Sequence, residues 1–214
     1  MSGLDIPTLL ARAIVLLIAF TIHELAHAVT ADRLGDPTPR RQGRITLNPL
    51  AHLDPIGTLM LLISGFGWAK PVMVQPSYLR GNPRTSMGIV AAAGPLSNLL
   101  LAVVAAIPLR LGLVDLSAGN GGMLPSLSFL LFQFIFINLI LLFFNLIPIP
   151  PLDGFKILTA VLPAEMAYQL RPLEQYGFLI LLLAIFILPN MGIDILGWLV
   201  QTPTRQLFSL ITGF

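Results

Sequence analysis

The sequence predicts an all-α polytopic membrane protein with four to six transmembrane helices, a short re-entrant segment and a small membrane-associated β-hairpin or edge strand. Of the 214 residues, 56% are hydrophobic and only 10% are charged, whereas soluble domains carry about 25% charged residues. Several apolar runs are long enough to cross the hydrocarbon core as helices. Because the length suits one domain, we expect a single membrane-embedded unit over residues 1–214, with its core in 6–160 and further helices in 173–214.

The first transmembrane helix is predicted over Ile6 to Thr30, an apolar run that Gly35 follows closely. A glycine just beyond a periodic run is a common helix stop. A secretory signal peptide is the alternative, but no small-residue cleavage site precedes the later structure, so we expect this helix to be retained. The polar stretch from Asp36 to Leu53 is then predicted to form a loop at the membrane–water boundary.

Two short segments follow this loop. Ile56 to Phe66 is apolar but has only 11 residues, which as a helix would span about 17 Å. Because the hydrocarbon core is about 30 Å thick, this segment is predicted to be re-entrant or buried against other helices. Trp68 to Tyr78 alternates loosely and contains two prolines, and proline confines a strand to a sheet edge. It is predicted to be an edge strand or a loop on the membrane surface.

The later part of the chain contains two further long apolar runs. Met87 to Leu109 is predicted to be a span, and its small residues allow close helix approach. A glycine-rich loop at Leu111 to Pro125 separates it from a span at Ser126 to Ile147. Three prolines and a glycine at Pro148 to Gly154 then break the helix.

The C-terminal segments are less clearly defined by the sequence. Tyr176 to Leu188 is a shorter apolar run. Ile193 to Val200, together with Leu207 to Phe214, is predicted to be one more span or an interfacial helix.

Positive charges predict the orientation of the chain in the membrane. Seven of the twelve Lys and Arg residues lie between positions 33 and 84. Arg12 and Arg110, in contrast, lie at the ends of their spans that face the other side of the membrane. Because positive loops stay in the cytoplasm, we expect residues 33–84 to lie on that side of the cell membrane. The net charge is only +2 without a long basic run, so a nucleic-acid partner is not expected.

The most informative motif is His23-Glu24-Leu-Ala-His27, which lies inside the first apolar helix. Ionisable groups at membrane depth are costly and mark functional sites. His23 and His27 are four residues apart, so both imidazoles project from one helix face and can share a metal ion. Glu24 is then placed to take a proton from a metal-activated water. Chance occurrence is the alternative, but it would leave three idle polar groups in lipid.

A catalytic zinc ion usually takes three protein ligands and a water, so a third ligand is needed. Because the chain has no cysteine, the ligand must be the remaining histidine or a carboxylate. His52 and the nearby Asp54 are candidates. Asp153 is favoured, because it follows a span that returns to the cytoplasmic side in a proline-broken stretch. Its alternative role is to cap the helix that starts at Gly154.

Three asparagines lie in or near predicted spans, and membrane helices commonly use such amides for interhelical hydrogen bonds. Asn145 precedes Asp153 by eight residues and could donate to a substrate carbonyl as negative charge develops on it. Asn98 is a weaker candidate for the same contact. Asn138 is interpreted as structural.

Together, these motifs resemble the site-2 protease family of intramembrane zinc metalloproteases. The similarity rests on the HExxH of the first helix and on the stretch from Asn145 to Gly154. It is most similar to the compact prokaryotic branch without PDZ or CBS domains. Supporting motifs, in order, are Leu47-Asn-Pro-Leu-Ala-His52-Leu-Asp-Pro55-Ile-Gly-Thr58, Gly67-Trp-Ala-Lys-Pro-Val72 and Gly94-Pro-Leu-Ser-Asn98.

The resemblance implies one zinc ion per chain, held by His23, His27 and Asp153, with Glu24 as general base. It also implies cleavage of a transmembrane segment of another protein, within the bilayer and near the cytoplasmic face. A metal or ion transporter is an alternative, although transporters often show repeated halves and no repeat is visible here. A catalytically idle homologue that binds membrane helices is a third interpretation.

Overall fold

The computed structural model describes residues 5–57, 60, 67–114 and 124–214, and the fold in these residues is helical. Within these described ranges, three helices are long and apolar enough to cross a membrane: α1 (Ile6–Arg33), α4 (Pro83–Arg110) and α5 (Leu127–Asn145). A pair of helices bent by 55°, Ala164–Leu170 with Leu173–Ile187, would make a fourth span. The all-α polytopic fold is confirmed, and the described part of the chain reaches the lower end of the predicted number of spans.

Both ends of α1 follow from local hydrogen bonding. The Asp5 side chain accepts from the backbone N–H of Thr8 at 2.9 Å and caps the first turn. After Arg33, Gly35 adopts a φ of +109°, a conformation that L side chains rarely adopt. The predicted glycine stop is therefore confirmed, and the helix extends three residues beyond the predicted end at Thr30.

In its described residues, the segment between α1 and α4 is mostly irregular. These residues include α2 (Thr38–Arg41) and two 3₁₀ turns, η1 (Pro49–Ala51) and η2 (Pro76–Tyr78). The re-entrant helix predicted at Ile56 to Phe66 lies almost entirely outside the described residues. The predicted β element reduces, within the described residues, to one antiparallel bridge between Leu53 and Ala69. Prolines without N–H groups limit further pairing along this segment.

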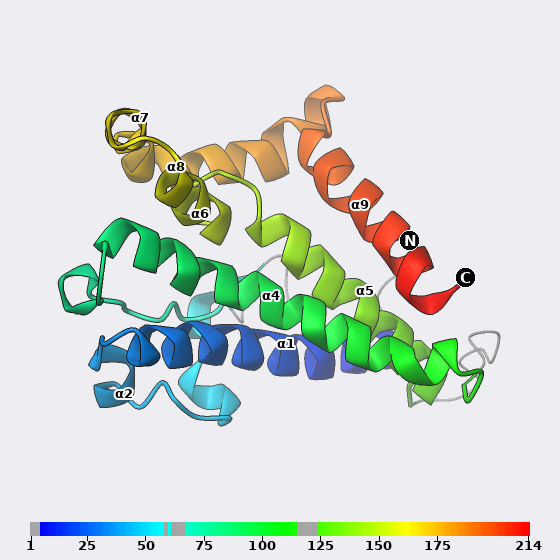
Figure 1. The fold of residues 1–214 in the computed structure, drawn as a ribbon. Helices are drawn as coiled ribbons and strands as arrows, with labels where there is room; N and C mark the ends of the chain where they lie inside the picture. Colours follow the sequence, from blue (N-terminus) through cyan, green and yellow to red (C-terminus); the bar gives the residue numbers. More distant parts are fainter. Residues whose placement is uncertain (1–4, 58–59, 61–66, 115–123) are drawn as a thin grey trace.

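The central helix of the fold is α4. It packs against α1, α5 and α6 (Asp153–Val161), and it runs beside α1 in the opposite direction (Figure 1). Small residues at the α4–α5 contact allow the two backbones to approach closely. The buried cluster there consists of Ala102, Ala106, Leu109, Ile135, Leu139 and Leu142.

The C-terminal helices close one side of this arrangement. After α7 (Ala164–Leu170), α8 (Leu173–Leu182) continues as a π-helical turn, η3 (Leu183–Ile187), and the turn η4 (Pro189–Met191) follows. The last element is one continuous helix, α9 (Ile195–Thr212), which packs along α5 (Figure 1). Its middle carries polar residues, so it is not among the helices apolar enough to cross a membrane.

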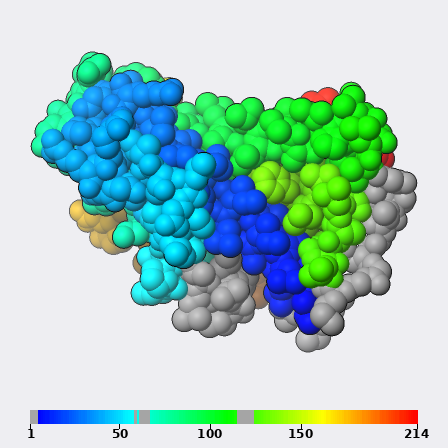
Figure 2. Space-filling view, turned by 90° about the horizontal axis from the view of Figure 1, so that it is seen from below, coloured from blue at the N-terminus to red at the C-terminus, as the bar shows by residue number. Residues whose placement is uncertain are grey.

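One face of the molecule is suited to contact with lipid. The space-filling view shows the outer side of α1 between the segment that follows it and the first turns of α5, with α4 along one edge (Figure 2). Large apolar side chains on α1 are exposed in the isolated chain, among them Leu10, Ile14, Leu17 and Ile18. Exposed apolar surface of this extent is typical of a membrane-facing helix.

Candidate metal centre

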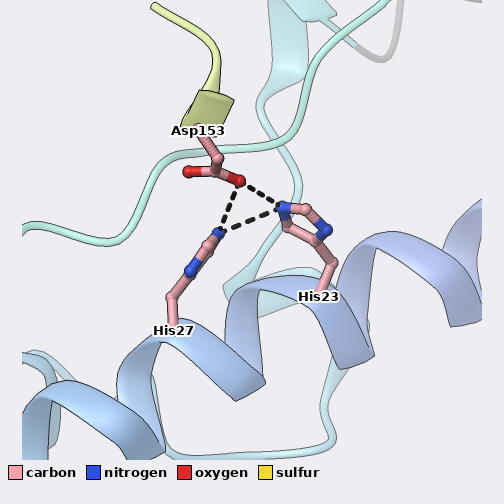
Figure 3. A group of neighbouring side chains, drawn as sticks. All are labelled: His23, His27 and Asp153. Atoms are coloured by element: carbon pink, nitrogen blue, oxygen red, sulfur yellow. Dashed lines mark hydrogen bonds and ion pairs between the residues drawn. The ribbon is translucent and has the colours of Figure 1, made fainter. Parts of the chain in front are cut away.

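Three donor groups from two distant parts of the chain meet near the middle of the helical bundle. His23 and His27 project from α1, and Asp153 approaches them from the start of α6 (Figure 3). The two Nε2 atoms are 3.0 Å apart. Asp153 Oδ2 lies 3.2 Å from Nε2 of His23 and 3.1 Å from Nε2 of His27. All three side chains are buried.

The local sequence explains how each donor reaches this point. The spacing of four residues places both histidines on one face of α1. Asp153 is the first residue of α6, and the cap position before it is occupied by Leu152, which makes no side-chain cap. Asp153 is therefore not the helix cap considered above. Gly154 allows the start of α6 to pack closely against Leu146, since a Cβ there would clash with the carbonyl oxygen of Leu146.

Hydrogen bonds on the far side of each imidazole orient the two rings. Nδ1 of His27 lies 2.7 Å from the backbone carbonyl oxygen of Val90, which can only accept, so Nδ1 of His27 donates. Nδ1 of His23 lies 2.6 Å from Oδ1 of Asn98. With a proton on each Nδ1, both Nε2 atoms present lone pairs to the centre. Ring orientation of this kind is typical of metal-binding histidines.

The donor set fits a zinc ion. Two imidazole nitrogens and one carboxylate oxygen converge on one point, and in these tautomers none of the three carries a hydrogen. Such donors bind zinc at about 2.0–2.2 Å, so tetrahedral ligands lie about 3.3 Å apart. The observed separations of 3.0, 3.1 and 3.2 Å are close to this spacing.

Gly94 of α4 forms a wall of the centre. A Cβ at this position would lie 2.5 Å from Nε2 of His23 and 2.5 Å from Nε2 of His27. The missing side chain therefore leaves the space in which the two imidazoles meet. This position belongs to the Gly94-Pro-Leu-Ser-Asn98 motif noted in the sequence, whose steric role could not be predicted from the residues.

Glu24 lies beside the centre and is held from two directions. Its Oε2 accepts from the backbone N–H of Val72 at 3.0 Å and lies 3.7 Å from Nη2 of Arg44. The Arg44 side chain is only 4% exposed and donates to the carbonyl oxygens of Ala51 and Lys70. Burial lowers the pKa of the Arg44 guanidinium, and the nearby Glu24 offsets only part of this effect; arginine nevertheless remains charged at any physiological pH.

Sequence reasoning missed Arg44 as part of the site. It lies in the polar loop among Arg40 and Arg41, and no pattern separates it from them. Those two neighbours are exposed, so only the folded loop distinguishes the buried arginine.

The donor centre opens into a cavity of about 610 Å³. Its walls include Glu24, Asn145 and the irregular segment from Gly67 to Val74. Most other lining side chains are apolar, and Lys156 is the only Lys or Arg side chain among the described lining residues. A chamber of this size can hold a short stretch of an extended, apolar peptide beside the metal centre.

The asparagine candidates separate clearly in the structure. Asn145 lines the cavity, and its Nδ2 donates to the carbonyl oxygen of Leu141 at 2.9 Å; among the described residues, its second N–H has no acceptor and can donate to a bound molecule. Asn98 is fully buried, does not line the cavity, and contacts His23 and Asn138. This placement does not favour the predicted substrate contact for Asn98.

The alternative third ligands lie elsewhere. Nε2 of His52 donates a hydrogen bond to the carbonyl oxygen of Thr46 at 2.9 Å. Oδ1 of Asp54 accepts from the backbone N–H of Gly57 at 2.8 Å. Neither residue belongs to the group formed by the histidines of α1 and Asp153 among the described residues.

Comparisons with known proteins agree with this chemistry. The profile of peptidase family M50 matches residues 111–188, a region that includes Asp153. The chain is 43% identical over 180 residues to the Bacillus subtilis protein named "Putative zinc metalloprotease YwhC", which covers 82% of this chain and 80% of that protein. It is 34% identical to "Putative zinc metalloprotease Rip2" of Mycolicibacterium smegmatis, over 77% of this chain and 62% of that protein. The Mycobacterium tuberculosis protein of the same name is 33% identical over 85% of this chain and 67% of its own length. No solved structure matches the chain.

Proposed function

Since this chain belongs to peptidase family M50, the site-2 protease family of zinc metalloproteases, we propose that it hydrolyses peptide bonds inside transmembrane segments of other membrane proteins. The observation that carries this proposal is the His23, His27 and Asp153 centre with Glu24 beside it. This centre is buried among helices that are apolar enough to span a membrane. Polar groups in such a place need a function to offset their cost.

In the proposed mechanism, His23, His27 and Asp153 would hold the zinc ion. When bound, zinc acts as a Lewis acid that lowers the pKa of a water molecule and polarises a carbonyl group. Glu24 accepts the proton of the attacking water and afterwards delivers it to the departing amine. The N–H of Val72 and the guanidinium of Arg44 keep its carboxylate facing the cavity.

Asn145 is proposed to bind the substrate carbonyl. Its free N–H lies on the wall of the same cavity as Glu24 and Asp153. A donor aimed at the oxygen on which negative charge develops stabilises the transition state more than the bound substrate. Removal of a single donor of this kind costs about 10²–10³-fold in kcat.

The substrate must present an extended strand of backbone to this site. A transmembrane helix hides its carbonyl groups in internal hydrogen bonds, so it must unwind locally before attack. The segment from Gly67 to Val74 lines the cavity outside any helix, and its Ala69 forms an antiparallel bridge with Leu53. We propose that it pairs with the unwound substrate by strand addition, which supplies backbone bonds without demanding a particular sequence.

The position of the site along α1 supports cleavage near the cytoplasmic face. His23 and His27 lie in the second half of this helix, toward the arginine-rich segment that follows Arg33. The positive-inside rule assigns that segment to the cytoplasm. The protein is therefore proposed to be a multi-pass protein of the cell membrane whose catalytic centre takes its water from the cytoplasm.

The proposal is tested with purified protein reconstituted with a tagged transmembrane peptide. Glu24→Gln should retain one zinc per chain and lose about 10²–10⁴-fold in cleavage rate. Glu165→Gln removes an exposed acid of α7 and serves as the matched control with wild-type rate. Equal cleavage by the wild type and Glu24→Gln would refute the protease mechanism. Zinc retention without cleavage of any transmembrane peptide would instead favour a transport or binding function.

A further inference from the structure

A continuous line of buried hydrogen bonds connects His23 to two other helices. Nδ1 of His23 lies 2.6 Å from Oδ1 of Asn98 on α4. Nδ2 of Asn98 donates to Oδ1 of Asn138 on α5 at 2.9 Å. Nδ2 of Asn138 donates to the carbonyl oxygen of Phe134 at 2.8 Å. Both asparagines are 0% exposed, so no solvent competes for these bonds.

The far end of this line determines the direction of every bond in it. The carbonyl oxygen of Phe134 can only accept, so the amide of Asn138 must turn its NH₂ group toward it. The oxygen of Asn138 then faces Asn98 and fixes the NH₂ group of that residue. The oxygen of Asn98 is left facing His23, whose Nδ1 must carry the proton. Nε2 of His23 therefore keeps its lone pair for the metal centre.

His27 obtains the same orientation by a simpler route. Its Nδ1 faces the backbone carbonyl oxygen of Val90 at 2.7 Å, an acceptor that no rotation can convert to a donor. A side-chain amide lacks this certainty, because a flip exchanges its oxygen and its NH₂ group. Asn98 would be an ambiguous partner for His23 without Asn138 behind it.

We propose that Asn98 and Asn138 are positioning residues that fix the metal-binding tautomer of His23 and thereby set the zinc affinity. This inference rests on the zinc ligands assigned under the proposed function. The alternative is that the two amides only join α4 to α5, a role that is common between membrane helices and modest in energy. A joining role alone would leave the zinc affinity unchanged.

The test measures the zinc dissociation constant of the full-length protein in detergent by competition with a chromogenic chelator. Asn98→Leu removes the acceptor for His23 and should raise this constant about 10–100-fold, the usual effect of losing an outer partner of a metal ligand. Asn98→Asp keeps an acceptor for Nδ1 of His23, and its buried carboxyl, when protonated, donates to Oδ1 of Asn138 in place of the lost NH₂ group, so zinc binding should be weakened far less than in Asn98→Leu. Asn138→Leu frees the Asn98 amide to flip and should weaken zinc binding by about tenfold or less.

Gln133→Leu provides the matched control. Gln133 is another buried amide of α5, and it is not part of the line that ends at His23. Gln133→Leu should leave the zinc dissociation constant unchanged. A general disturbance of α5 would instead raise this constant equally in Gln133→Leu and Asn138→Leu. Thermal unfolding of each zinc-free variant reports the purely structural contribution.

A second measurement on the wild type keeps the proposal open to refutation if the Asn98 variants do not fold. The chain has only three histidines, so NMR of isotope-labelled imidazoles in the zinc-loaded protein can assign each ring. We expect metal on Nε2 of His23 and a slowly exchanging proton on its Nδ1. Metal on Nδ1, or unchanged zinc affinity in Asn98→Leu, would overturn the positioning role of Asn98 and Asn138 but not the protease assignment. A wild type that binds no zinc would instead remove the ligand set of the proposed function.

Discussion

Replacement of Gly94 by alanine is expected to disable the metal centre while leaving the fold intact. The added Cβ would lie 2.5 Å from Nε2 of both His23 and His27, whereas ordinary van der Waals contacts lie at 3.4–4 Å. Each contact is therefore short by roughly 1 Å. Zinc–ligand distances tolerate only about 0.2 Å of deviation, so at least one imidazole must leave its position. We expect the zinc dissociation constant to rise at least about 100-fold, or about 2.8 kcal/mol.

The same substitution has the opposite effect on the helix itself. Alanine is favoured over glycine in a helix interior by about 1 kcal/mol, and Gly94 has no positive φ that would strain an alanine. Without zinc, the imidazoles can turn away from the new methyl group at the cost of their Nδ1 hydrogen bonds to Val90 and Asn98, and the gain in helix propensity offsets this cost. The zinc-free Gly94→Ala protein should therefore unfold close to the wild-type temperature, and only the stabilisation that zinc adds by binding the folded state should be lost.

The assay follows thermal unfolding with and without a saturating amount of zinc, together with chelator competition for the metal. Leu96→Ala, on the exposed side of the same helical turn, controls for substitution in this part of α4 and should show the full zinc-dependent rise in midpoint. If Gly94→Ala bound zinc as tightly as the wild type, the steric argument would be wrong, and with it the packing of α4 against the two histidines.

Two further predictions address Asp153 and Arg44. Asp153→Ala leaves two imidazoles as the only protein ligands and should raise the zinc dissociation constant by at least about 100-fold; unchanged zinc content after dialysis would return the third-ligand assignment to His52 or Asp54. Arg44→Met removes the buried cation beside Glu24 and leaves the carbonyl oxygens that Arg44 bonds without a donor, so it should destabilise the protein by about 3 kcal/mol while zinc is retained. Loss of zinc from Arg44→Met, at a temperature where the protein remains folded by circular dichroism, would contradict that placement.

Contacts of the site could be predicted from the sequence only where helical periodicity or membrane topology links the interacting residues. The pairing of His23 with His27 follows from helical periodicity alone, because the two residues are one turn apart. The prediction that Asp153 joins these two histidines rested on the side of the membrane to which the preceding span returns. Neither helical periodicity nor the topology of a span indicates a role for Arg44. Its burial depends on how an irregular loop folds over Glu24, and no local periodicity encodes that.

The asparagines illustrate a different limit. Asn98 and Asn145 look alike in the sequence, each a single amide near a polar motif. The structure separates them by what each oxygen and NH₂ group faces: Asn145 lines the cavity, whereas Asn98 contacts Nδ1 of His23. The direction of an interhelical hydrogen bond is set by tertiary packing, so composition and spacing could indicate a polar network but not its polarity.

The metal centre therefore depends on α4 as much as on the helices that supply the donors. Val90, Gly94 and Asn98 recur every four residues and lie on one stripe of α4, and this stripe faces the two histidines, which are themselves four residues apart on the antiparallel α1. One end of the stripe orients His27 through a backbone carbonyl, the other orients His23 through an amide, and the glycine between them leaves room for both rings. Matching repeats on the two helices bring all three contacts into register at once. A rotation or a one-residue shift of α4 would thus remove both hydrogen bonds and place a side chain between the imidazoles.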